Sequence, residues 1–162
     1  MFFRRPAYLI GKDVNGMEFL TGARESGQLK RKDIMEGGYR NRTVQVHGMV
    51  HAKREMGGGL IFLKLRMRDG LLQCVCAGME LGEVPEEAAV VVTGMLRDEP
   101  RAPGGVELAA EQVEVLSRPA APMPIPVPKA KLNVNLDTEL ELRPAVLRHL
   151  RERSVFKLQE CL

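Results

Sequence analysis

The chain of 162 residues suits one domain of ordinary size, or a smaller domain with appended segments, and its 44% hydrophobic content supports a packed core. No apolar run reaches about 18 residues, which excludes a membrane-spanning helix. Lys and Arg outnumber Asp and Glu 14 to 6 in residues 1–68, whereas the acids lead 15 to 10 in residues 69–162, so the front half suits a polyanionic partner or carries a solvated basic face.

Residues 1–42 show no sustained periodicity and are interrupted by glycines, so they are predicted to form an N-terminal extension. One short helix is expected near Gln28–Met35. The basic run Lys30-Arg31-Lys32 is suited to contact with a phosphate backbone, and a disordered leader would have the same composition. No secretory signal peptide is evident, and we expect a cytoplasmic protein.

Residues 43–117 contain five segments with the alternation or the β-branched content of strands. Gly48 and Gly94 lie inside two of them, where a tightly coiled barrel needs a bend or a close backbone approach. Residues 78–87 form a connector. These features predict an all-β fold, a five-stranded Greek-key barrel of the oligonucleotide-binding (OB) type, with a generic β-barrel adaptor as the alternative. The expected strands are Arg42–Arg54, Leu60–Leu65, Leu71–Ala77, Ala88–Leu96 and Val106–Leu116.

The second and third expected strands form a hairpin, with a tight-turn signal at Asp69-Gly70. Alternation places Phe62, Lys64 and Arg66 on one face, and Gln73 of the partner strand joins them. An aromatic ring that stacks and an amide that hydrogen-bonds are the means by which proteins read an unpaired base. An ordinary hairpin with one exposed phenylalanine would show the same pattern.

The three cysteines and three histidines supply no convincing set of metal ligands. Cys74 and Cys76 lie two residues apart on an apolar strand face, where a buried thiol packs as a small hydrophobic group. Cys161 lies far from them, so a disulfide framework is not expected. Zinc would need about four nitrogen or sulfur ligands in a closed site, and no metal site is predicted.

Residues 118–143 are predicted to form a proline-rich linker and hinge. Five prolines between Arg118 and Lys131 indicate a stiff, extended segment, and the polar–apolar segment Leu132–Arg143 follows. A helix is expected from about Pro144 to the end of the chain, because proline is favoured in the first turn of a helix.

Three motifs of this chain resemble the front of aspartyl-tRNA synthetases of the archaeal and eukaryotic kind. The barrel carries the pattern G-x-V…R…G-G-x-L-I-F-x-x-L-R…D-G-x-x-Q, including the eleven-residue interval between Phe62 and Gln73. The fifth strand carries V-E-L at Val106–Leu108, and the hinge carries L-D-T…R at Leu136–Arg143. The resemblance covers about residues 43–162, and the asparaginyl and lysyl enzymes belong to the same class II subgroup.

This resemblance implies that the barrel binds the anticodon of an aspartate tRNA. Phe62 would stack on the middle anticodon uracil, and Gln73 would hydrogen-bond the edge of that base. Arg54 would approach a phosphate or base of the anticodon loop, and Glu107 would contact a neighbouring base. Arg66 has a second expected role, bracing the hairpin. The expected RNA-binding residues are Arg54, Phe62, Lys64, Arg66, Gln73 and Glu107.

The resemblance also implies that residues 144–162 begin a truncated catalytic domain of a longer ligase. The ATP-binding arginine motifs of that ligase, used with ATP and Mg²⁺, are absent here, so we expect this chain to contain no catalytic residue and no cofactor. The family forms homodimers mostly through the missing domain, which leaves the oligomeric state of this chain open. The alternatives are a free-standing synthetase-derived module for RNA or protein interaction, and a relative that serves asparagine tRNA or both tRNAs, whose anticodons share the middle uracil.

Overall fold

The computed structural model describes residues 9–12, 18–21, 28–79, 81–82 and 84–162. In the N-terminal part, β1 (Leu9–Lys12) pairs antiparallel with β2 (Glu18–Thr21), a pairing that the sequence did not predict. The expected short helix is present as α1 (Arg31–Met35).

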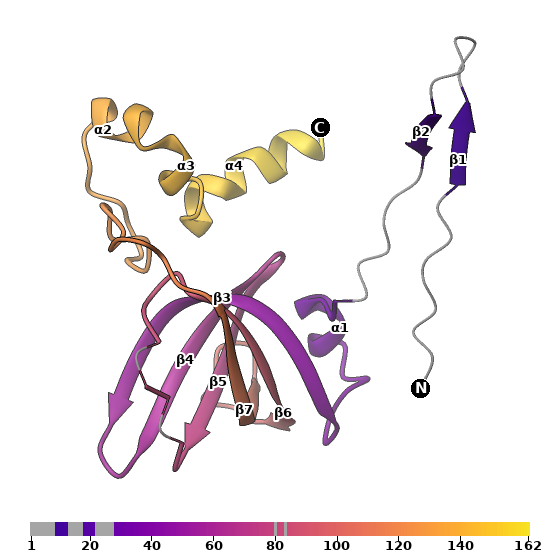
Figure 1. Cartoon of the computed structure of the whole chain (residues 1–162), viewed down its shortest axis with the longest axis vertical. Helices are drawn as coiled ribbons and strands as arrows, with labels where there is room; N and C mark the ends of the chain where they lie inside the picture. Colours follow the sequence, from indigo (N-terminus) through magenta and orange to yellow (C-terminus); the bar gives the residue numbers. More distant parts are fainter. Residues whose placement is uncertain (1–8, 13–17, 22–27, 80, 83) are drawn as a thin grey trace.

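Five strands close into a barrel, in which each strand hydrogen-bonds to two neighbours in the order β3-β4-β5-β7-β6 and β6 returns to β3 (Figure 1). β5 and β7 run parallel, and the other four pairs are antiparallel. This arrangement confirms the predicted OB-type barrel. The strands are β3 (Thr43–Met56), β4 (Leu60–Met67), β5 (Gly70–Ala77), β6 (Ala89–Asp98) and β7 (Val106–Ser117).

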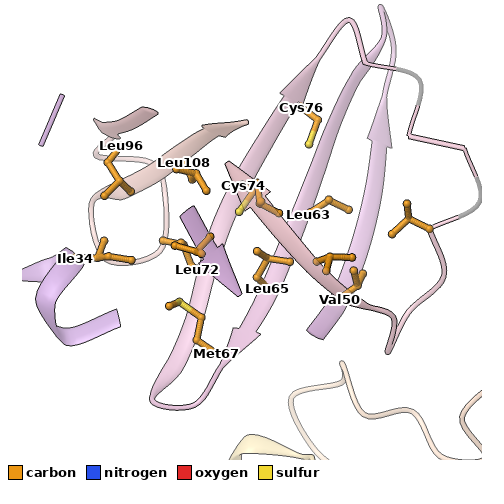
Figure 2. Packing of buried hydrophobic residues seen from close by; sticks show 14 of the residues in the cluster. Ile34, Val50, Leu63, Leu65, Met67, Leu72, Cys74, Cys76, Leu96 and Leu108 are labelled. Atoms are coloured by element: carbon orange, nitrogen blue, oxygen red, sulfur yellow. The ribbon is translucent and has the colours of Figure 1, made fainter. Parts of the chain in front are cut away.

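The barrel interior is filled by the apolar face of each strand, as the alternation predicted. Leu63 and Leu65 of β4 face Leu72 and Cys74 of β5, and all four are fully buried (Figure 2). Burial raises the pKa of Cys76 to about 11, so its thiol stays protonated and packs as an apolar group.

Two strand glycines permit the close backbone approach that the barrel needs. A Cβ atom on Gly94 would lie 2.1 Å from the carbonyl oxygen of Ala109, and one on Gly48 would lie 3.2 Å from that of Arg66. The pairing of β3 with β4 also shifts in register between Val50 and Ala52. His51 is only 5% exposed although its neighbour Val50 is fully buried, because the irregularity interrupts the alternation of faces.

The helix α1 covers one end of the barrel. Its Ile34 is fully buried in the barrel core, and the carboxylate of Asp69 accepts hydrogen bonds from the backbone N–H groups of Arg31 and Lys32 at 3.0 and 2.8 Å. Burial alone would raise the pKa of Asp69, but these backbone hydrogen bonds hold it below its ordinary value. Asp69, predicted as a turn residue, therefore also fixes α1.

The proline-rich segment is more than an extended linker. Ile125 and Val127, 2% and 1% exposed, pack with Leu132 and Val146 in a second small hydrophobic cluster. Proline on each side of Val127 keeps the backbone extended, so that residues two apart can share a buried face.

The C-terminal part contains three helices, α2 (Leu136–Glu141), α3 (Arg143–Val146) and α4 (Leu150–Glu160), beside one end of the barrel (Figure 1). The prediction of a single helix from Pro144 is wrong, because the helical conformation is interrupted between α3 and α4. His149 has an extended conformation there, and its Nε2 atom lies 2.8 Å from the carbonyl oxygen of Lys129. Within the part of the chain that the structure describes, no helix is both long and apolar enough to cross a membrane.

Candidate nucleic-acid interface

Two transverse rows of residues cross the outer face of the barrel. In the first row, Phe62 of β4 lies between Arg54 of β3 and Val75 of β5. Phe62 is partly buried, so part of its side chain is open to solvent, and Arg54 beside it is exposed. The ring is thus available for stacking beside a cation.

The second row lies one pleat further along the strands. Lys64 of β4 pairs with Gln73 of β5, which pairs in turn with Glu107 of β7. Opposite Glu107, the row continues on β6 with the exposed Arg97. Arg97 was not predicted as part of this surface, because its position beside Glu107 depends on the register of the β6–β7 hairpin.

Phe62 and Gln73 lie on neighbouring strands and on the same outer face, as their alternation with buried residues predicted. Both side chains are partly buried, and they are diagonal neighbours because Gln73 pairs with Lys64. Diagonal neighbours in a sheet are within reach of a shared aromatic ligand. The geometry therefore allows one planar base to stack on the ring and meet the amide at its edge.

Glu107 of β7 orients the Gln73 amide. Its Nε2 atom lies 3.4 Å from Oε2 of Glu107, at the long end of hydrogen-bond range. A carboxylate only accepts hydrogen bonds, so the amide atom that faces it is the NH₂ group. The Oε1 atom of Gln73 is then free to accept a hydrogen bond from a ligand.

Unlike the other predicted RNA-binding residues, Arg66 is buried. Its guanidinium donates hydrogen bonds of 2.6 Å to both carboxylate oxygens of Glu87, and the residue is 7% exposed. Arg148, which follows α3, donates to the same carboxylate at 2.9 Å. Arg66 therefore joins β4 to the connector before β6, whereas its second expected role was to brace the hairpin.

Glu87 was not singled out by the sequence analysis. It is buried, has a left-handed backbone conformation with φ of 65°, and lies in the connector before β6. Burial alone would raise the pKa of its carboxyl group, but the hydrogen bonds and positive charge of Arg66 lower it, and Arg148 adds to this effect. No local sequence signal predicts this pairing, because its partners are 21 and 61 residues away.

Comparison with known proteins decides the family of the barrel. Residues 44–116 match the tRNA anticodon family, described as an OB-fold nucleic acid binding domain. The barrel belongs to this family. The match covers the five strands that carry the two outer rows.

Relatives extend the similarity beyond the OB-fold domain. The chain is 39% identical over 121 residues to the aspartate–tRNA(Asp/Asn) ligase of Deinococcus radiodurans, covering 75% of this chain and 27% of that protein. It is 40% identical over 119 residues to the ligase of the same name from Thermus thermophilus, covering 74% of this chain and 28% of that protein. The chain thus spans about a quarter of the length of these curated relatives.

A solved structure shows the same arrangement. The asparaginyl-tRNA synthetase of Pyrococcus horikoshii superposes with a TM-score of 0.68 at 25% identity, over 83% of this chain and 33% of that one. The likeness therefore includes residues on both sides of the OB-fold domain, since that domain occupies only residues 44–116 and either flank is longer than the part of the chain that is not covered.

Proposed function

We propose that the barrel binds the anticodon loop of a tRNA and reads its middle uracil. Phe62 stacks on the base, and Gln73 accepts a hydrogen bond at the base edge. The observation that carries this proposal is the diagonal placement of the partly buried Phe62 ring and the Gln73 amide on the outer face of a barrel from the anticodon-binding family. A stacked base contributes about 1–3 kcal/mol.

By orienting the Gln73 amide, Glu107 determines which base can form a hydrogen bond with it. With the NH₂ group of Gln73 turned toward Glu107, the Oε1 atom accepts the N3–H of uracil. Cytosine has an acceptor at the same position, so two acceptors would meet and the base would be disfavoured. Arg54, Lys64 and Arg97 are the exposed cations of these two rows and are suited to the phosphates of the loop.

We expect aspartate tRNA as a ligand, and asparagine tRNA as well. The relatives from D. radiodurans and T. thermophilus are named for both tRNAs. Since both anticodons have a middle uracil, the contacts of Phe62 and Gln73 serve both. Discrimination between them would require contacts to other bases, for which Glu107 was the residue expected from the sequence.

The aminoacylation activity of the relatives would belong to a larger protein. This chain matches about a quarter of their length, so ATP and Mg²⁺ would act in a region that the chain does not match. For that larger protein we also propose a homodimer and a cytoplasmic location.

The test is binding of this chain to a tRNA transcript with an aspartate anticodon, measured by fluorescence anisotropy at low salt. Phe62→Ala should weaken binding by about 1–3 kcal/mol, which is roughly 5- to 150-fold. The matched control is Phe156→Ala on α4, an exposed phenylalanine that should leave affinity unchanged. Equal effects of the two substitutions would contradict the stacking role.

A second part of the experiment tests the alternative that the chain is a module that binds other proteins. If the chain binds no tRNA at low salt but forms a defined complex with another protein, the anticodon proposal fails. If binding is unchanged when the middle uracil is replaced by cytosine, the barrel still binds the tRNA, but the proposal that it reads the middle uracil fails.

A further inference from the structure

The barrel and the C-terminal part meet at a junction that contains two buried histidines. His51 of β3 is 5% exposed, and His149, between α3 and α4, is 3% exposed. Both residues line one cavity, whose other residues come from β5, the proline-rich segment and the first turn of α4. Neither residue belongs to the two outer rows of the barrel, so the proposed anticodon binding gives them no role.

The closed junction accommodates neutral imidazole rings. The Nε2 atom of His149 donates to the carbonyl oxygen of Lys129 at 2.8 Å, because a carbonyl oxygen only accepts hydrogen bonds. Protonation puts a hydrogen on both nitrogen atoms of a ring. The Nδ1 atoms of His51 and His149 are buried and have no hydrogen-bond partner among the residues that the structure describes. A charged ring would therefore bury an N–H group without an acceptor, which is unfavourable.

The charged groups around the junction also oppose protonation of His51. They are Lys64 and Arg66 of β4, Glu87 of the connector, Lys129 of the proline-rich segment, and Arg148 and Arg151 of the C-terminal part. The carboxylate in this set, that of Glu87, already accepts hydrogen bonds from Arg66 and Arg148. Glu152, also in the first turn of α4, lines a different pocket beside Phe156. A proton on His51 would thus add a cation where cations already outnumber carboxylates.

The pKa of His51 follows from this arrangement. Burial lowers the pKa most, and the positive charge of Arg66 lowers it next, whereas Glu87 raises it. Lys64 and His149 lower the pKa further. Because the ordinary pKa of histidine is 6.5, an exposed His51 would take up a proton at a pH at which the buried ring is still neutral.

We propose that this junction is a pH-sensitive latch, which holds the C-terminal part on the barrel while His51 is neutral and releases it when His51 is protonated. The stabilisation of the closed junction is complete above about pH 6.5 and is lost as pH falls toward the lower pKa of the closed state. The pKa of Glu87 lies below its ordinary value of 4.5, so the Arg148–Glu87 ion pair keeps its charges at pH 5.5. The latch does not depend on the proposed anticodon binding.

Uptake of one proton sets the size of the effect. If His51 has a pKa of 6.5 in the released state and stays neutral in the closed state, the equilibrium constant for release rises about tenfold between pH 7.5 and 5.5. This value is the upper limit for His51 alone, because any protonation in the closed state reduces the difference between the two states.

The experiment measures the distance between the C-terminal part and the barrel in the whole 162-residue chain. Cys161 is exposed whereas Cys74 and Cys76 are buried, so a spin label attaches at residue 161. Glu111→Cys supplies the second label at an exposed position of β7. Double electron–electron resonance then gives the distance distributions at pH 7.5 and 5.5. We expect the ratio of released to closed molecules to rise by up to about tenfold at the lower pH.

His51→Gln keeps a polar side chain that cannot take up a proton, so it should remove the pH response. The matched control is His47→Gln on the same strand. His47 pairs with Val91 of β6 and is not part of the cavity wall. This control should respond to pH as the unsubstituted chain does.

Two results would overturn the proposal. One is a distance distribution that is the same at pH 7.5 and 5.5, and the other is an equal pH response in His51→Gln and His47→Gln. If His51→Gln is already released at pH 7.5, NMR titration of the His51 ring in the unsubstituted chain decides the question. Protonation of the ring should accompany release, and a ring that becomes charged while the junction stays closed contradicts the latch.

Discussion

The guanidinium of Arg66 and the carboxylate of Glu87 form two hydrogen bonds of 2.6 Å, with both side chains almost fully buried. Through this pair the outer side of β4 is joined to the connector before β6. Arg148 extends the pair to the segment after α3, which follows the proline-rich region. A planar, two-pronged contact of this kind fixes direction as well as distance. The β4–β5 hairpin and the C-terminal helices are thereby held to one anchor.

Glu87→Gln should destabilise the chain by roughly 3–5 kcal/mol, because it leaves the buried Arg66 charge without its partner. Urea unfolding followed by circular dichroism measures the change. The matched control is Glu86→Gln, since Glu86 is an exposed neighbour. A midpoint that shifts equally in both variants would show that the pair contributes little.

The contribution of Glu87 should decline in acid. Its folded-state pKa lies below the ordinary value of 4.5, so the stabilisation is complete above that pH and is lost as pH falls through the folded-state pKa. The difference in unfolding free energy between the unsubstituted chain and Glu87→Gln should therefore be constant from about pH 7 to 5 and shrink below about pH 4. A difference that grows in acid would reverse the assigned sign.

Gly94→Ala should destabilise the barrel by about 1–3 kcal/mol or more, because β6 and β7 must move apart to admit a methyl group 2.1 Å from the carbonyl oxygen of Ala109. Gly38→Ala is the control, since its Cβ would meet nothing within 4 Å. Thermal unfolding of the two variants makes the comparison. Similar melting temperatures would mean that the strands separate at little cost.

Glu107→Ala should reduce base discrimination more than affinity. Without the carboxylate the Gln73 amide can turn over, so its NH₂ group can face the N3 acceptor of cytosine. The preference for a middle uracil over cytosine, about 1–3 kcal/mol for a good base contact, should shrink. Binding of the two transcripts to both proteins is the measurement. Glu111→Ala, an exposed glutamate further along β7, is the control.

Lys64→Gln should lower the salt dependence of tRNA binding. If its ammonium neutralises one phosphate, the slope of log K against log salt should fall by about 0.7 to 0.9. The control is Lys157→Gln, which removes an exposed lysine from α4. The same slope in all three proteins would place Lys64 away from the RNA backbone.

The period-two alternation of the sequence determined which side of each strand faces the core. It placed Phe62 and Gln73 on the outer face, and the glycines within strands indicated where backbones approach closely. These features are local, because a strand's two faces follow from the backbone of that strand alone. For the same reason, the expected short helix and the five strands could be located before any pairing was known.

Only the tertiary structure decided which outer residues meet. The parallel pairing of β5 with β7 brings Glu107 to Gln73, and the register of the β6–β7 hairpin brings Arg97 beside Glu107. Arg66 shares the face of Phe62 by alternation, yet it is buried in a pair with Glu87, which is 21 residues away. His51 is buried where the register of β3 shifts. The contacts of Gln73 with Glu107 and of Arg66 with Glu87 join residues 34 and 21 positions apart, so they depend on chain closure and packing rather than on local periodicity.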